Sequence, residues 1–321
     1  MFDPATVPVA PVRPRVVVVG SLHYDIMVRA PYLPRTGETL IGETWWWKPG
    51  GKGGNQAMAA ARHGAEVEMI GCLGDDGFGE RLRASLADAG VGLGHILRGE
   101  QGSGMSVALE QDGGDYAAVV VSGANREIDE AQVIAEADVI RTADVLLLQN
   151  EINEAASAAA ARLAREAGVT VVHNAAPARA PGARAGLVDV LVVNTVEAEQ
   201  LGAGPVADLD AAAVAAVALR EICPSVIVTA GGAGVAAAGP AGVVELRPHP
   251  VERARTHGAG DVFTGALAAR LAGGEPLSVA LRYANAAAAL HVGTAEGERE
   301  ALGPDAVKAL LAARPEDPAG S

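Results

Sequence analysis

The sequence has few aromatic residues, few cysteines and fewer basic than acidic side chains. Only 3% of its 321 residues are aromatic while 50% are apolar, so a sizeable core is expected, built mainly from aliphatic side chains. With 25 Lys and Arg against 39 Asp and Glu, the net charge is −14. This balance argues against nucleic acid as a partner, because phosphate backbones are bound by basic surfaces.

Long apolar runs are also missing. Cys72 and Cys223 are far apart in apolar contexts, which favours two buried thiols in a reducing cytosol over a disulfide. No run approaches the roughly 18 apolar residues of a membrane span. The first residues, MFDPATVPVAPVRPR, lack the basic start of a signal peptide. We therefore expect a cytoplasmic protein with no membrane partner and with tails at 1–14 and 314–321.

Between the tails, short β-branched runs alternate with helical segments. Strands are predicted at 15–20, 66–71, 144–149, 169–174, 188–194 and 225–232, and helices at 54–64, 77–90, 154–167, 208–221, 259–272 and 276–291. Such an alternation produces parallel strands with helices on both faces. The sequence therefore predicts one α/β domain over residues 15–313, with a mostly parallel central sheet.

Two segments, 26–48 and 104–122, interrupt this alternation. Both have the pattern of strands and turns, and EQDGGD is typical of a hairpin turn, so a small antiparallel sheet is expected beside the main one. Three tryptophans are consecutive at 45–47; in a strand, Trp45 and Trp47 share one face and Trp46 takes the other. One face could cover a ligand site, and the other face could contact a second subunit. Equally, one face could lie on the main domain.

The stretch GAGD places small residues before a carboxylate at the start of a helix. The backbone N–H groups of Gly258, Ala259 and Gly260 have no partner within the helix, and the helix dipole adds partial positive charge. A phosphoryl group can approach such a bare backbone, and Asp261 could accept the proton of an attacking hydroxyl. The alternative is an ordinary N-cap aspartate.

A second glycine-rich loop, KPGGKGGNQ, precedes the predicted helix at 54–64. It is not a Walker A loop, because no Ser or Thr follows Lys52. Lys52 can donate hydrogen bonds to hydroxyl groups, and Asn55 can both donate and accept them. The alternative is a loop that only starts a helix.

Further polar residues follow the predicted strands. His23 and Asp25 follow the first strand, and Glu151 follows the strand at 144–149. In open α/β sheets, ligands bind at the carboxyl ends of the strands. The positions fit groups that hold a polyol, although each alone is equally consistent with a surface turn.

The strands nearer the C-terminus end in the same way. Asn194 and Glu197 are one helical turn apart, and Glu197 could hold Mg²⁺ through waters or be a solvated acid at a helix start. Thr229, Gly231 and Gly234 form a glycine-rich strand exit that could hold phosphates. All these residues fall at one edge of one predicted sheet. The alternatives, in which each motif is only a turn or a helix start, do not explain why they gather at that edge.

Five motifs together resemble those of the PfkB-type sugar kinases. They are GGKGGNQAMAAARHGA, GDDGFG, NTVEAE, TAGGAG and GAGDVFTGAL, in the family's order, and the similarity extends from about residue 15 to 295. Within the family, the ribokinase group is the most similar.

The resemblance implies a ribokinase-like three-layer α/β sandwich with a β-sheet lid, and transfer of the γ-phosphoryl group of MgATP to a primary hydroxyl. Asp261 matches the catalytic base, and Gly258, Ala259 and Gly260 match the anion hole. The sugar side is implied at His23, Asp25, Gly51, Lys52, Asn55 and Glu151, the nucleotide side at Asn194, Thr229, Gly231, Gly234 and Asn285, and the magnesium–water network at Glu197. The resemblance also implies a homodimer formed through the lids.

Two departures from the family pattern affect the expected substrate and ion. His23 and Tyr24 stand where ribokinases usually have Asn and a small residue, so the substrate could be ribose, another sugar, or a nucleoside such as pseudouridine or a purine nucleoside. Arg255 stands where an Asp usually helps to hold potassium, and the segment HVGTAEGERE also departs. A guanidinium could supply the charge permanently, which predicts activity without a monovalent cation. Alternatively, Arg255 points to solvent.

Two further readings stay open. In a nucleoside kinase, Trp45–Trp47 or Tyr116 could stack on a base. In a non-catalytic sensor of a sugar or nucleotide, the lid would signal by closing; the intact GAGD with Asp261 argues against it.

Overall fold

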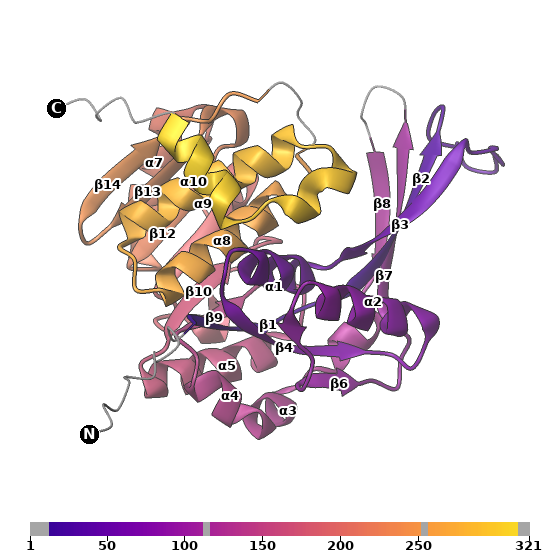
Figure 1. Cartoon of the computed structure of the whole chain (residues 1–321), viewed down its shortest axis with the longest axis horizontal. Helices are drawn as coiled ribbons and strands as arrows, with labels where there is room; N and C mark the ends of the chain where they lie inside the picture. Colours follow the sequence, from indigo (N-terminus) through magenta and orange to yellow (C-terminus); the bar gives the residue numbers. More distant parts are fainter. Residues whose placement is uncertain (1–12, 112–115, 252–255, 314–321) are drawn as a thin grey trace, which may run out of the picture.

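The computed structural model describes residues 13–111, 116–251 and 256–313 and has a ten-stranded central sheet (Figure 1). Its order is β14–β13–β12–β11–β10–β9–β1–β4–β5, with β6 paired to β4. The strands are β1 (Arg15–Val19), β4 (Glu66–Leu73), β5 (Val91–Gly92), β6 (Ile96–Arg98), β9 (Val145–Leu148), β10 (Thr170–Asn174), β11 (Val190–Asn194), β12 (Ser225–Thr229), β13 (Val235–Gly239) and β14 (Gly242–Leu246). All neighbouring strands pair in parallel except at one edge, where β13 pairs antiparallel with both β12 and β14.

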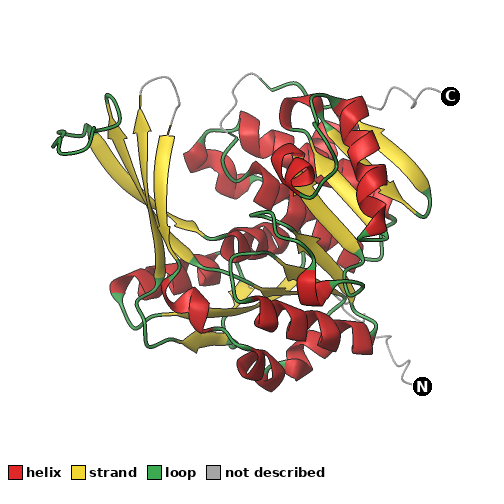
Figure 2. Ribbon diagram, turned by 180° about the vertical axis from the view of Figure 1, so that it is seen from behind, coloured by secondary structure: helices red, strands yellow, loops and turns green. Residues whose placement is uncertain are grey.

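Helices cover both faces of this sheet (Figure 2). On one face lie α1 (Lys52–Arg62), α2 (Gly77–Asp88), α8 (Ala259–Ala272), α9 (Leu277–Gly293) and α10 (Pro304–Ala313). On the other lie α3 (Glu130–Ala135), α4 (Ala137–Arg141), α5 (Glu154–Ala167), α6 (Thr195–Gln200) and α7 (Leu209–Ala218). Because alternate strand residues point to opposite faces, Val16 and Val18 of β1 join one core and Val17 and Val19 the other. The predicted three-layer sandwich is confirmed.

The lid is a separate four-stranded sheet, β3–β2–β7–β8, that projects from the main body (Figure 1). Its strands are β2 (His23–Ala30), β3 (Thr44–Gly50), β7 (Gly104–Gln111) and β8 (Tyr116–Val121). The expectation of a purely antiparallel sheet is wrong, since β2 and β7 are parallel. Both strands start at the body, where His23 pairs with Gly104, and run outward, while β3 and β8 return. Of the EQDGGD turn, residues 112–115 lie outside the described residues.

The three tryptophans alternate between the lid faces as predicted. Trp46 lines a cleft between the lid and the body, whereas Trp45, on the other face, is 65% exposed. Trp47 shares that outer face and stacks on Tyr24 at a ring-centroid distance of 4.7 Å, and Tyr24 stacks on Phe78 of α2 at 4.2 Å. The outer face therefore packs on the main domain near the start of β2 and is exposed farther along the lid.

Loss of the central ring of this stack is expected to loosen the lid. Tyr24→Leu removes two aromatic contacts, each worth about 0.5–1.5 kcal/mol beyond area burial. Hydrogen exchange measured by mass spectrometry should accelerate in β2 and β3 by roughly 2- to 10-fold for each pair lost, and not in β9–β11. Tyr32→Leu, at an exposed lid position, is the control. Unchanged exchange in Tyr24→Leu would show that the stack does not hold the lid.

Candidate active site

Asp261 lies in the first turn of α8, after an N-cap glycine, Gly258, with φ 81°. Its Oδ1 accepts a hydrogen bond from Gln56 Nε2 (2.9 Å) and its Oδ2 accepts one from Asn55 Nδ2 (3.2 Å). The carboxyl is 9% exposed, and burial raises the pKa of Asp261 above its ordinary value, although the charge of Lys52 and these hydrogen bonds oppose the shift. Asp261 is thus a fixed carboxylate of increased basicity.

A buried amide network behind Asp261 was not predicted from the sequence. Gln56 Nε2 also donates to Asn174 Oδ1 (3.0 Å), and Gln56 Oε1 accepts from Gln149 Nε2 (2.8 Å). Asn174 ends β10 and Gln149 follows β9. Their positions at strand exits are the same signal that identified Glu151, so the strand-end rule could have found them.

Five of the six predicted sugar-side residues line one cleft of about 650 Å³ between the lid and the body, and the sixth, Asn55, does not line it but bonds Asp261. The cleft is lined by His23, Asp25, Gly51, Lys52, Glu151 and Asp261. Because β2 begins at His23, the first two of these belong to the lid itself and not to the end of β1. Polar groups of the lid and polar groups of the body therefore line the same cleft.

Hydrogen bonds fix the two other predicted carboxylates that line the cleft with Asp261, those of Glu151 and Asp25. Glu151 Oε2 accepts from Ser21 Oγ (2.5 Å) and from the backbone N–H of Lys52 (2.9 Å), and His23 Nδ1 lies 4.0 Å from it. Asp25 Oδ1 accepts from Ser106 Oγ (2.5 Å). The oxygens that these bonds leave free can accept hydrogen bonds from the hydroxyls of a polyol.

Gly51 permits the close approach that brings α1 to the cleft. Its φ is 80°, and a Cβ there would lie 2.8 Å from Ser21 O and from His23 N. Only glycine adopts this conformation readily and leaves that space. Helix α1 can therefore begin against the exit of β1, which places Asn55 beside Asp261.

Several ionisable residues that were not predicted also line the cleft: Arg29, Lys48, Glu110, His257, Glu296 and Arg299. Lys48 shares its lid face with Trp46, so strand alternation could have identified it. Burial lowers the pKa of Lys48, against the opposing charges of Glu296 and Asp25. The cleft thus offers both donors and acceptors beyond those predicted.

The predicted nucleotide-side residues form a second group, and none of them lines this cleft. Asn194 ends β11 beside Thr229 at the end of β12, with Gly231 and Gly234 in the following turn. Asn285 lies on α9, where its Nδ2 donates to Arg247 O (3.0 Å). Apart from Asn285, the group lies at strand exits of the same sheet edge.

Glu197 forms a capping box with Asn194. Its Oε2 accepts from Asn194 N and its own N–H donates to Asn194 Oδ1, both at 2.8 Å. Burial raises the pKa of Glu197, with Asp261 also raising it and Lys52 lowering it. The described residues contain no group of three or more His, Cys, Asp or Glu able to hold a metal. A cation here would need waters for most of its ligands, which is how Mg²⁺ commonly binds.

Arg255 lies outside the described residues, whereas part of the segment expected near the ion site is described. In the 3₁₀ turn η5 (Glu296–Ala301), Arg299 Nε donates to Thr294 O (3.1 Å). One carbonyl oxygen of that segment is therefore already bonded to a permanent cation. In the same described ranges, no helix is long and apolar enough to cross a bilayer.

Comparisons with known proteins agree with this architecture. Residues 13–300 match the pfkB family carbohydrate kinase profile. The chain is 34% identical over 278 residues to a ribokinase of Bacillus subtilis, covering 86% of this chain and 92% of that one. It is 33% identical over 293 residues to a ribokinase of Haemophilus influenzae, covering 90% and 95%.

A solved structure shares the whole fold. The structure of Arabidopsis thaliana ribokinase complexed with ribose and ATP superposes with a TM-score of 0.85 at 29% identity, covering 94% of this chain and 99% of that one. The two-layer helical cover, the lid and the cleft are thus those of a known architecture. The chain belongs to the pfkB family of carbohydrate kinases and is a ribokinase-like sugar kinase, a phosphotransferase.

Proposed function

We propose that this protein transfers the γ-phosphoryl group of ATP to a primary hydroxyl of ribose or a related sugar. The observation that carries the proposal is Asp261, held by Asn55 and Gln56 at the start of α8 and facing a cleft lined by Asp25 and Glu151. The ribokinase similarity and the ribose and ATP named for the Arabidopsis structure support this choice.

In the proposed reaction, Asp261 takes the proton of the sugar hydroxyl. The hydroxyl oxygen forms a bond to the γ-phosphorus, the bond from that phosphorus to the bridging oxygen breaks, and ADP leaves with the electron pair. Asn55 and Gln56 hold the carboxylate in place, and Lys52 adds positive charge nearby. The raised pKa of Asp261 favours this transfer, because a stronger base takes the proton more readily.

The backbone of Gly258, Ala259 and Gly260 is proposed to stabilise charge on the transferred group. A Cβ at Gly260 would meet no atom within 4 Å, so the backbone there is open to a ligand. Asn194, Thr229, Gly231, Gly234 and Asn285 are proposed to hold the nucleotide. Glu197 would hold Mg²⁺ through waters, and that ion would supply charge to the phosphates.

Sugar is favoured over nucleoside by the ribokinase relatives, and the lid offers only Trp46 as a tryptophan that could stack on a base. Of the three tryptophans only Trp46 lines the cleft, so Trp45 and Trp47 cannot stack on a bound base. A nucleoside kinase remains the alternative, supported by the cleft's volume and by His23, and the non-catalytic sensor is disfavoured by the polar network around Asp261.

The exposed outer face of the lid is proposed as a homodimer contact. Trp45, Val119 and Val121 lie on this face, and each is more than half exposed. Exposed apolar side chains gathered on one sheet face are typical of subunit contacts.

The substrate is tested by measuring ADP release with MgATP against ribose, 2-deoxyribose, fructose, uridine, pseudouridine, inosine and adenosine. We expect turnover with ribose or a close relative. A preference for a nucleoside would favour the alternative. A ligand that raises the melting temperature without turnover in any reaction would favour the sensor.

The same assay tests the ion. Because Arg255 replaces the usual Asp and Arg299 already bonds Thr294 O, turnover should be equal in potassium, sodium and choline chloride at one concentration. Strong stimulation by potassium alone would contradict the proposed role of Arg255. Using three chloride salts keeps the anion constant.

A further inference from the structure

Arg184 is an arginine inside the protein, away from the cleft. It ends the 3₁₀ turn η2 (Gly182–Arg184) after β10 and is 1% exposed. Its Nη1 donates to Asn150 Oδ1 (2.7 Å) and to His173 Nε2 (3.0 Å). Its Nε and Nη2 are buried and have no hydrogen-bond partner among the described residues. Unpaired buried donors of this kind commonly indicate a water or ion at the site.

The charge of Arg184 is only partly compensated in the described part of the chain, because burial and the charge of Arg179 lower its pKa while the charge of Glu154 opposes them. None of the ion pairs found there includes Arg184, and its two partners are neutral. Burial, together with the charge of Arg184, lowers the pKa of His173 to about 3, so this imidazole is uncharged at neutral pH. Burial of a charge that is only partly compensated is costly, and an anion would reduce that cost.

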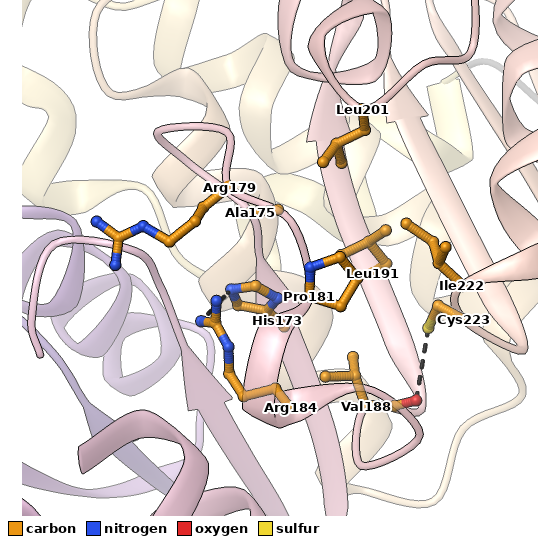
Figure 3. A pocket seen from close by; sticks show the side chains of 10 residues that line it. All are labelled: His173, Ala175, Arg179, Pro181, Arg184, Val188, Leu191, Leu201, Ile222 and Cys223. Carbon is orange, nitrogen blue, oxygen red and sulfur yellow. Dashed lines mark hydrogen bonds between the residues drawn. The ribbon is translucent and has the colours of Figure 1, made fainter. Parts of the chain in front are cut away.

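A small cavity is lined in part by Arg184 (Figure 3). It has a volume of about 20 Å³, and its lining includes Arg184, His173, Arg179 and Cys223, with Leu191 and Ile222 among its apolar walls. A water molecule needs roughly 10–15 Å³, so the space holds one small species and excludes a phosphate. Burial raises the pKa of the Cys223 thiol to about 11, so the sulfur is not the missing anion.

We propose that this cavity is a binding site for a monatomic halide, chloride in ordinary buffers, held by Nε–H and Nη2–H of Arg184. These two groups form one edge of the guanidinium fork and can bind one acceptor together. A halide accepts both bonds and has no hydrogens to satisfy. A water would direct its hydrogens at apolar walls, and His173 Nε2 already accepts from Arg184.

The halide would also support the sheet edge that carries the catalytic cleft. Arg184 bonds Asn150, and Asn150 directly precedes Glu151 in the sequence. The Nδ2 of Asn150 in turn donates to Pro177 O (2.8 Å). Occupation of the cavity therefore stabilises the exit of β9 and should raise the stability of the folded protein by mass action.

Thermal unfolding tests the proposal independently of any enzymatic activity. Sodium gluconate is replaced stepwise by sodium chloride at constant ionic strength. In the native protein the melting temperature should rise and saturate, by about 2 °C or more. Arg184→Met, which fills similar volume without charge, should abolish the rise, and Arg141→Met, at a more exposed arginine outside the cavity, should retain it. An equal rise in all three proteins, or none in the native protein, would overturn the proposal.

A crystallographic measurement covers the case in which Arg184→Met does not fold. Crystals of the native protein soaked in sodium bromide should show an anomalous peak in contact with Arg184 Nε and Nη2. An ordered water there without anomalous signal, or an empty cavity, would overturn the halide assignment.

Discussion

Replacement of Asp261 by Asn is expected to lower kcat by about 10²–10⁴-fold, the usual contribution of a positioned general base. The amide is nearly isosteric and cannot take the hydroxyl proton, while Asn55 and Gln56 still border it. In the native enzyme, kcat/KM should rise with pH through the raised pKa of Asp261, and Asp261→Asn should lose that acidic limb. Steady-state kinetics from pH 4 to 8 with the preferred sugar would measure the loss of kcat and the pH dependence of kcat/KM.

The same substitution should leave the protein equally or more stable at neutral pH. Burial raises the pKa of Asp261 above the value of about 3.9 expected in the unfolded chain, so folding favours the protonated carboxyl. The stability from protonation is complete below the unfolded pKa and is lost as the pH rises through the folded pKa. At neutral pH the native protein therefore carries the cost of a buried charge, which Asn lacks.

Asp210→Asn is the matched control, since Asp210 also lies in the first turn of a helix but is exposed. Its activity and melting temperature should be those of the native protein. Full activity in Asp261→Asn, or a loss of the same size in Asp210→Asn, would remove Asp261 from the proposed role.

The second large effect is expected at Gly265, where α8 crosses α1. A Cβ at this position would lie 2.5 Å from Gln56 O, 2.6 Å from Ala59 Cβ and 2.9 Å from Ala60 N. Two of these neighbours are backbone atoms, so Gly265→Ala must move one helix away from the other. Overpacking of this kind typically costs about 1–3 kcal/mol. The movement would also separate Gln56 from Asp261.

We therefore expect Gly265→Ala to lower both the melting temperature and kcat, although residue 265 lies one helical turn beyond Asp261. Gly77→Ala is the control, because a Cβ there meets nothing within 4 Å. Calorimetry would measure the melting temperatures of the two variants, and steady-state kinetics would measure their kcat. If Gly265→Ala loses stability but keeps full kcat, the α1–α8 contact does not position the base.

The helices were the best predicted part of the fold. The intervals 154–167 and 259–272 coincide with α5 and α8. Both are long runs of Ala and Leu bounded by clear signals, such as Gly168 and Gly273 at their C-termini. The place of Glu151 in the cleft was also predictable, because strand exits of a parallel sheet share an edge, whereas Asp25 and Lys52 reach the cleft from the lid and from the start of α1.

Pairings between distant segments were not predictable. The parallel alignment of β2 with β7 joins residues about eighty positions apart, and the local pattern of each strand is the same for either direction. The bonds from Gln56 to Asn174 and Asp261 depend equally on tertiary placement. For Glu197, the capping box accounts for its place at a helix start, while its proposed role toward magnesium stays a prediction.

Only Gly51 separates the last lid residue, Gly50 of β3, from Lys52, the first residue of α1. The lid cannot tilt without either rotating the backbone at this residue or shifting the helix that bonds Asp261 through Asn55. In the proposed reaction, enclosure of a sugar and alignment of Asp261 would thus be one motion. A sugar too large or too small to seat the lid would meet a misaligned carboxylate, so selectivity among sugars should show in kcat as well as in KM.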